Sequence, residues 1–419
     1  MIRSLSRLLI GTLAAVLAFG GGQAIASSTG GQAAPNTREV ILVGNNWEGT
    51  ADVLRPKGDY RRIERINIIP DEEERMMEVM TDPERLFYFL AIQQLIGEGN
   101  NQYVDDMYTS NDGRLLIVSR PSFRDVVALN LRSGEIVWRF VVDGQRSDHM
   151  AISPNGKQVA ISASTGNVVH ILDTKTGQEV DRFPSGDSPH ENIYSADGKR
   201  IYHASIGLVY TPGDDGQLDT DTSKGERYFQ IVRTRDHKIV KRLDMGKELE
   251  RAGYPNMSSA VRPMAVGKRE GFVYFQVSFF HGFVEYNLKK EKVRRIARLP
   301  ISEEAKNTPR EQYLLDSAHH GIALSGNGKR LCVAGTMSDY AAIVNRRNFK
   351  YKVFRRGEKP YWSTTSSDGK RCYVSWSGTD RISVFSFRKR KEIARIRVGD
   401  HPQRIRTGFI RKGILAGRR

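Results

Sequence analysis

The segment ISPNGKQVAIS, residues 152–162, decides the fold because close copies of it recur along the chain. Most copies place Asp-Gly or Asn-Gly, followed by Lys or Arg, ahead of a segment of alternating residues. This pattern predicts a β-hairpin, since glycine adopts a positive φ without steric cost. The copies lie at 109–119, 152–162, 194–204, 324–334 and 366–376, with a degenerate one at 266–277. Their turn glycines are Gly113, Gly156, Gly198, Gly271, Gly328 and Gly369.

The spacing of the copies predicts the architecture. Where no insertion intervenes, the copies are about 42 residues apart, and each hairpin is followed by a second one. The resulting unit of four antiparallel strands has the size of a β-propeller blade. Six copies predict six blades. We expect a seventh to combine a C-terminal strand at 401–406 with N-terminal strands at 39–44, 51–55 and 62–69. The sequence thus predicts an all-β, seven-bladed β-propeller closed by strands from both termini, with a small helical insertion.

Two stretches also carry a resemblance to a known family. NVVHILDTKTGQEVDRFPSGDSPHENIYSADGKRIYHAS, residues 167–205, resembles the YVTN-type β-propeller repeat family, and RISVFSFRKRKEIARIRVGDHP, residues 381–402, repeats the later part of that pattern. The resemblance covers most of residues 103–406 and implies an exported propeller. It implies no particular activity, because such propellers serve binding, scaffolding and several enzyme chemistries.

The N-terminal segment has the features of a secretory signal. Residues 1–26 contain Arg3 and Arg7, a short apolar run and the small-residue pattern Ala24-Ile25-Ala26, which predict a cleaved signal peptide. We divide the chain into a signal peptide at 1–26, a flexible linker at 27–38, the propeller at 39–410 with its helical insertion at 70–98, and a basic tail at 411–419. We expect a periplasmic, cell-envelope or extracellular monomer with no transmembrane anchor after cleavage.

Composition excludes several classes of protein. The 419 residues include 65 Lys and Arg against 48 Asp and Glu, for a formal net charge of +17. This balance excludes an acidic solvating protein and leaves anionic partners open. Two cysteines are too few for a disulfide scaffold or a four-cysteine zinc module. Cys332 and Cys372 fall in second strands of adjacent blades with opposite parity, so an inter-blade disulfide and two separate buried thiols both stay open.

The long insertions all belong to one face of the predicted disc. They occupy residues 70–102, 211–227, 244–261 and 299–317. All four are connections on the face of the disc at which the innermost strand of each blade begins. Insertions concentrated on one face of a repeat protein mark a binding face. Asp71 with Glu74, and Asp82-Pro83, are helix N-terminal signals in the first insertion. Its second helix has a wide apolar surface, which either packs over the disc or forms a lid or groove for a partner.

The innermost strands begin on that face with polar residues, including five of the nine histidines. Imidazoles and carboxylates that converge on one axis can bind a metal or an anionic ligand. The alternative is a hydrated ring without a ligand. The candidate ligand site consists of Asp105, Asp106, His149, His190, Glu191, Arg262, His319, His320, Trp362, His401 and Arg404. The candidate metal ligands are His149, His190, His319 and His320.

Two classes of function follow. The first is an exported binding or scaffold propeller that uses the insertion-rich face and the channel mouth to bind a protein or an anionic cell-envelope polymer. The alternative is a channel-mouth enzyme or metal-binding propeller, oxidoreductase or lactonase-like, that uses the His/Asp/Arg cluster. The sequence contains no H-E-x-x-H, G-x-S-x-G, P-loop or C-x-x-C motif, so enzyme activity and cofactor stay open. Nucleic acid is a weaker option, because aromatic residues do not interleave with the basic runs.

Overall fold

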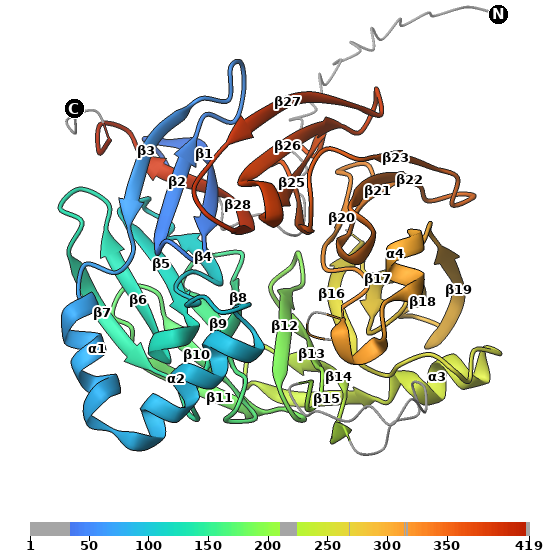
Figure 1. Cartoon of the computed structure of the whole chain (residues 1–419), viewed down its shortest axis with the longest axis horizontal. Helices are drawn as coiled ribbons and strands as arrows, with labels where there is room; N and C mark the ends of the chain where they lie inside the picture. The colour runs from blue at the N-terminus through green and yellow to red at the C-terminus, as the bar shows by residue number, and fades with distance from the viewer. Residues whose placement is uncertain (1–33, 210–223, 268, 314, 316, 416–419) are drawn as a thin grey trace, which may run out of the picture.

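Seven four-stranded antiparallel sheets stand around a common axis in the computed structural model (Figure 1). The structure describes residues 34–209, 224–267, 269–313, 315 and 317–415. This arrangement is a seven-bladed β-propeller, which confirms the fold predicted from the repeat. The signal peptide predicted at 1–26 lies outside the described residues, as does most of the predicted insertion at 211–227.

The first six blades follow one another along the chain, each with four consecutive strands. Blade one contains β4 (Asp106–Thr109), β5 (Leu115–Arg120), β6 (Asp125–Asn130) and β7 (Ile136–Val141). Blade two contains β8 (Ser147–Ile152), β9 (Gln158–Ala163), β10 (Val168–Asp173) and β11 (Glu179–Pro184). Blade three contains β12 (Pro189–Tyr194), β13 (Arg200–Ser205), β14 (Phe229–Arg233) and β15 (Lys238–Leu243).

The second half of the ring repeats this plan. Blade four contains β16 (Val261–Val266), β17 (Phe272–Val277), β18 (Gly282–Asn287) and β19 (Lys292–Arg298). Blade five contains β20 (Ile322–Leu324), β21 (Arg330–Gly335), β22 (Tyr340–Asn345) and β23 (Tyr351–Phe354). Blade six contains β24 (Pro360–Thr365), β25 (Arg371–Trp376), β26 (Arg381–Ser386) and β27 (Lys391–Arg397).

Blade seven closes the ring with strands from both ends of the chain. It contains β1 (Thr37–Asn45), β2 (Thr50–Leu54), β3 (Arg62–Asn67) and, at its inner edge, β28 (Pro402–Arg411). β28 pairs antiparallel with β1, from Thr37 opposite Arg411 to Asn45 opposite Pro402, as the sequence predicts. The innermost strands β4, β8, β12, β16, β20, β24 and β28 contact one another in a closed circle. Closure leaves no exposed inner edge for pairing with another chain.

A serine explains why the turn motif recurs. In five blades a Ser precedes Asp/Asn-Gly, and its hydroxyl donates to the Asp or Asn side chain and accepts from a backbone N–H of the returning strand. The following glycines have φ between 67° and 70°. Blade four departs from this pattern, because the left-handed residue there is Glu270 (φ 49°) and not the predicted Gly271.

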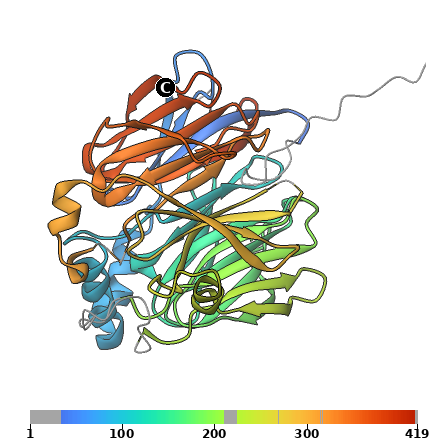
Figure 2. The same ribbon diagram turned by 90° about the vertical axis from the view of Figure 1, so that its right-hand side faces the viewer.

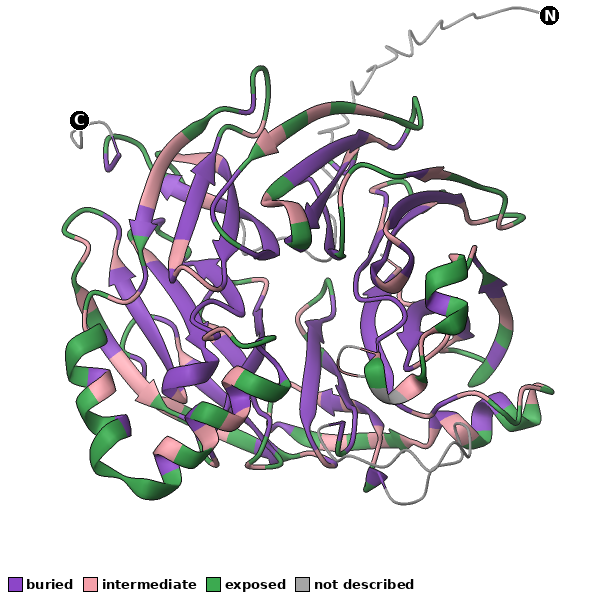
Figure 3. Ribbon diagram, in the orientation of Figure 1, coloured by how far each residue is buried: buried purple, intermediate pink, exposed green. Residues whose placement is uncertain are grey.

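Apolar side chains fill the spaces between neighbouring blades. Figure 3 shows that much of the strand ribbon is formed by buried residues. Between blades five and six the filling includes Cys332, Cys372 and Trp376. The structure joins the two cysteines by a disulfide, with their Cα atoms 6.4 Å apart. The bond connects β21 of blade five to β25 of blade six, so it crosses the interface between these two blades.

The α-helices among the described residues are α1 (Glu72–Thr81), α2 (Pro83–Leu95), α3 (Met245–Arg251) and α4 (Glu303–Asn307). Short 3-10 turns lie between strands at η1 (Pro121–Phe123), η5 (Thr336–Ser338) and η6 (Ser377–Thr379), and after α4 at η3 (Arg310–Gln312). Figure 2 shows α1, α2 and α4 on the same side of the disc. Among the described residues no helix has both the length and the apolar character needed to cross a membrane.

The two predicted helix starts have different outcomes. Asp82 caps α2, because its Oδ1 accepts from the backbone N–H groups of Glu84 and Arg85. Asp71 precedes α1 but makes no side-chain cap bond, so this detail of the prediction is wrong. Its carboxylate is instead used by Arg120, which anchors the insertion to blade one. The competing partner is a buried guanidinium, a stronger hydrogen-bond donor for a carboxylate than a backbone N–H.

Candidate functional site

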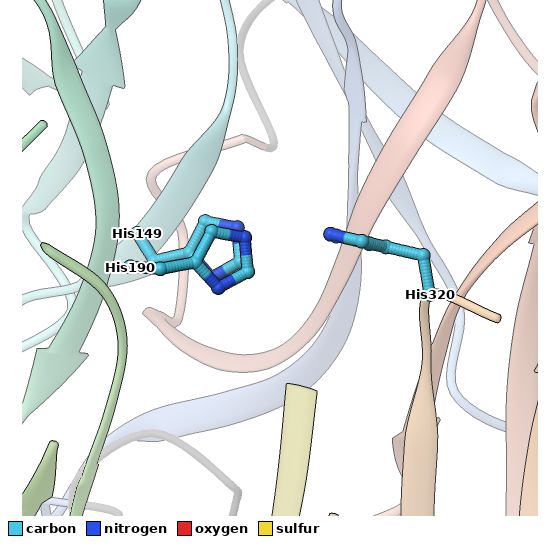
Figure 4. A group of neighbouring side chains, drawn as sticks. All are labelled: His149, His190 and His320. Carbon is cyan, nitrogen blue, oxygen red and sulfur yellow. The ribbon is translucent and has the colours of Figure 1, made fainter. Parts of the chain in front are cut away.

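Three histidines from three blades converge at the axis (Figure 4). His149 lies in β8, His190 in β12, and His320 directly before β20. One ring nitrogen of each lies within 4.8 Å of the others, and all three side chains are buried. Figure 4 shows the rings of His149 and His190 overlapping on one side, with a nitrogen of His320 directed toward them from the other. We call His149, His190 and His320 the three-histidine cluster.

The rings of the cluster are held by their neighbours. The His149 and His190 centroids are 3.7 Å apart, and Nδ1 of His149 lies 2.7 Å from Oε2 of Glu191. In the tautomer with hydrogen on Nδ1, Glu191 accepts it and Nε2 keeps its lone pair, as in metal-ligating histidines. His320 packs on Tyr361 with a centroid distance of 4.3 Å. The Nδ1 atom of His190 has no hydrogen-bond partner within the described part of the chain.

Burial determines the charge of these imidazoles. It lowers the pKa of His149, His190 and His320 well below 6.5, because an imidazolium loses its hydration there. The positive charge of Arg404 lowers the pKa of His149 and His320 further. Burial also raises the pKa of Glu191 to about 8. The three rings are therefore neutral at physiological pH, the form that binds metals.

Acidic residues around the cluster are paired with arginines. Asp106 receives two hydrogen bonds from Arg406, at 2.8 and 2.6 Å. Asp148 receives Arg146 at 2.5 Å and Ser164 at 2.6 Å. One oxygen each of Asp105 and Asp148 also lies near a nitrogen of His149, in a second group of potential ligands. The three-histidine cluster is the better metal site, because Asp148 of the second group is already engaged by Arg146 and Ser164.

Arg404 and Trp362 form a stacked pair beside the cluster. The guanidinium carbon of Arg404 lies 3.6 Å from the centroid of the Trp362 ring. The indole N–H of Trp362 donates to Thr364 at 3.0 Å, which fixes the ring. Nε of Arg404 donates to the backbone carbonyl of Asp105 at 3.1 Å. The pair joins blades six, seven and one at the same axial end as the histidines.

The structure places the other predicted site residues around this centre but outside the cluster. His319, a predicted metal ligand, is not part of it: its Nε2 lies 3.0 Å from the hydroxyl of Tyr340. Adjacent residues on an extended chain point to opposite sides, so His319 and His320 cannot both face the axis. His401 stacks on Trp47 with a centroid distance of 3.8 Å. Arg262 is fully buried and donates through Nε to Ser278 at 3.0 Å.

Sequence reasoning missed Arg146 and Gln145, which connect the axis to the helical insertion. Gln145 accepts from Arg85 of α2 at 3.1 Å and donates to Glu84 at 2.9 Å. Arg146, the next residue, pairs with Asp148. Their position directly before β8 was the available signal, because the predicted site residues also lie near the starts of inner strands. α2 therefore lies over the connection that carries part of the site.

The insertion exposes large apolar side chains. On α1 and α2 these are Met77, Met80, Phe87, Leu90 and Leu95, of which Phe87 is 66% exposed. We call these five residues the α1–α2 face. Val79 and Phe89 of the same helices are buried in the core cluster that spans blades seven and one. Part of the predicted wide apolar surface thus packs on the disc, and part is left uncovered (Figure 3).

Comparison with known proteins supports the fold and leaves the family open. The chain matches no family model, so membership of the YVTN repeat family is not confirmed. A search of curated proteins likewise finds no match. Among solved structures, the chain is similar to hydrazine synthase of Kuenenia stuttgartiensis, with a TM-score of 0.55 and 14% identity over 74% of this chain and 96% of that one. At this identity the likeness concerns the propeller fold alone.

Proposed function

We propose that this protein is a metal-binding β-propeller whose three-histidine cluster holds one d-block metal ion at the axis. The observation that carries the proposal is the convergence of His149, His190 and His320, from blades two, three and five, within 4.8 Å. Nothing local in the sequence requires three strands so far apart along the chain to present imidazoles to one point. A metal ion gives that convergence a physical reason.

The donor set favours ions that prefer nitrogen. Neutral imidazole suits zinc, copper, iron and nickel, whereas calcium and magnesium prefer oxygen ligands. Three histidines around zinc leave a fourth position for water or another ligand. Metal–nitrogen bonds of about 2.1 Å place tetrahedral ligand atoms about 3.4 Å apart, and the three ring nitrogens lie within 4.8 Å of one another. Glu191 would orient His149 as an outer-shell partner.

Metal titration tests this proposal. Protein freed of metal is titrated with Zn(II), Co(II) and Cu(II) and followed by calorimetry, and Co(II) or Cu(II) binding is followed by absorption as well. We expect one ion per chain. We expect His190→Ala and His320→Ala each to weaken binding by at least 100-fold, because two ligands remain.

His319→Gln is the matched control, because His319 neighbours His320 but lies outside the cluster. We expect it to keep the stoichiometry and affinity of the unmodified protein. The proposal is wrong if no ion binds saturably, or if His319→Gln loses as much affinity as His320→Ala.

The α1–α2 face favours a second function, the docking of another protein. Two neighbouring helices expose five large apolar side chains, and such a cluster is uncommon on a surface that faces water. Binding of a partner there would remove them from water. We therefore propose that this face, on the same side of the disc as α4, binds a protein partner. Phe87→Ser with Leu90→Ser should abolish retention of partners from an extract of the native compartment, whereas the exposed-residue control Arg114→Ser should not.

Export and binding of an anionic cell-envelope polymer rest on the sequence alone. The signal-like residues 1–26 support export, and the net charge of +17 supports binding of an anionic polymer. Cell fractionation tests the first, and N-terminal sequencing of the mature protein should begin at residue 27. A salt series against an acidic polysaccharide and DNA tests the second, since charge-driven binding weakens steeply with salt.

A further inference from the structure

The guanidinium of Arg404 is the part of the axis that metal binding does not explain. Arg404 in β28 is fully buried, and its Nε donates to the carbonyl of Asp105. Its Nη1 and Nη2 atoms have no hydrogen-bond partner among the described residues. The Asp105 carboxylate lies 3.5 Å from Nη2, too long for a good hydrogen bond. A buried cationic donor without an acceptor is costly, so an unexplained one at a site points to a ligand.

Trp362 holds this guanidinium in a fixed orientation. The two groups are 3.6 Å apart, and Thr364 anchors the indole through its N–H. Stacking covers a face of the planar guanidinium and leaves its N–H groups directed outward in the plane. The side chain is therefore preorganised to present Nη1 and Nη2 together to an acceptor.

We propose that Nη1 and Nη2 of Arg404 bind a small carboxylate beside the three-histidine cluster. Two coplanar carboxylate oxygens match the two parallel N–H groups of a guanidinium edge. The Trp362 ring on which Arg404 stacks has its centroid 5.8 Å from that of His149 and 5.9 Å from that of His320, so Arg404 lies beside the cluster. The carboxylate would thus lie next to the metal, as a substrate or a further ligand of it.

The surrounding charges favour a singly charged anion. Arg146 and Arg406 are engaged with Asp148 and Asp106, whereas Arg404 is paired loosely, with the Asp105 carboxylate 3.5 Å from its Nη2. One carboxylate would complete the pairing of Arg404. A phosphate dianion would bring a second negative charge into a buried site beside Asp105, at a large desolvation cost.

This inference deepens the proposed function, because it names the class of ligand at the same site. Its test needs no metal, so the two can fail separately. Metal-free protein is titrated with acetate and formate at low ionic strength by calorimetry, with phosphate and acetamide as comparison ligands. We expect one acetate or formate per chain, with phosphate and neutral acetamide binding at least tenfold more weakly.

Arg404→Gln removes the charge, and Arg404→Lys keeps the charge without the two parallel N–H groups of the guanidinium. We expect Gln to weaken acetate binding at least tenfold and Lys by an intermediate factor, while the metal stoichiometry of both stays that of the unmodified protein. Exposed Arg182→Gln is the matched control and should bind acetate normally. If the Arg404 variants do not fold, acetate should still change the tryptophan fluorescence of the unmodified protein and not that of Trp362→Phe. Equal acetate affinity in Arg404→Gln, no saturable carboxylate binding, or preference for phosphate overturns the proposal.

Discussion

The axis of the ring and the helical insertion distribute their side chains in opposite ways. At the axis, Arg404, His149 and Glu191 are buried among other charged or ionisable groups. On α1 and α2, Phe87 and Met77 are 66% and 65% exposed. Neither region follows the usual partition of polar outside and apolar inside. The buried polar groups at the axis are stabilised only by pairing with one another or with a bound ligand. The exposed apolar area of the insertion can be removed from water only by contact with a larger surface. The two regions are therefore suited to different ligands, a small polar one and a macromolecule.

The contact that anchors the insertion to blade one gives the largest expected effect. Arg120 of β5 is fully buried between Asp125 of the ring and Asp71 at the start of the insertion. Arg120→Met should lower the free energy of unfolding by about 3 kcal/mol, because it removes the fully buried one of the two arginines that pair with Asp125 and with Asp71. Chemical denaturation measures this, and proteolysis within 70–98 should accelerate.

Arg114→Met is the control for that substitution. Arg114 pairs with Asp112 at the surface at 3.5 Å, and its loss should cost less than about 0.5 kcal/mol. Equal effects of the two substitutions would show that Arg120 does not anchor the insertion.

Acid should act on the ring before the insertion. Burial lowers the pKa of His203 and of His401 to about 3, against about 6.5 in the unfolded chain. Below pH 6.5 the unfolded chain binds more protons than the folded one, so stability is complete above that pH and falls toward pH 3. At pH 5 each histidine should cost up to about 2 kcal/mol. Residues 70–98 contain no histidine.

Denaturation curves at pH 7.5 and 5.0 measure this loss. His203→Gln should shrink the difference between the two pH values, since glutamine does not titrate. An unchanged difference would contradict the assignment of the pH effect to His203.

The cap of α2 tests the insertion by itself. Oδ1 of Asp82 accepts from the N–H groups of Glu84 and Arg85 at 2.9 and 3.2 Å. Asp82→Ala should lower stability by about 1 kcal/mol, and Asp82→Asn, which can still cap, by much less. Thermal unfolding of both variants measures the difference. A similar loss in both would mean that the cap bonds do not stabilise the helix.

Two phenylalanines of α2 give the smallest effect and its sharpest contrast. Exposed Phe87→Ser should change stability by less than about 0.5 kcal/mol, because the side chain buries little area. Buried Phe89→Ala, two residues away, should cost up to about 3 kcal/mol. Denaturation of both variants measures this. A large loss for Phe87→Ser would show that the α1–α2 face is part of the fold and not a free surface.

Local chemistry explains how much of the fold was predictable. The Ser-x-Asp/Asn-Gly turn makes its bonds within a few residues, so five copies reveal five hairpins wherever they lie. The Asp82 cap was predictable for the same reason. The partner of Asp71 was not predictable, because Arg120 is 49 residues away in the sequence. As a buried cation, Arg120 binds the carboxylate in preference to the backbone N–H groups of α1. Gly271 was assigned to a turn by analogy, and the backbone used Glu270.

The sequence by itself determined the blade period, the closure of the ring by both termini and the axial end at which polar residues gather. These follow from turn chemistry and strand alternation, which are local. Only the tertiary structure decided which of those residues meet. It brought His149, His190 and His320 together and turned His319 toward Tyr340. It also stacked the guanidinium of Arg404 on Trp362, with no hydrogen-bond acceptor for its Nη atoms in the part of the chain that the structure describes. The physical reason is that each blade contributes one or two side chains to the axis, so their distances depend on how all seven blades pack around it.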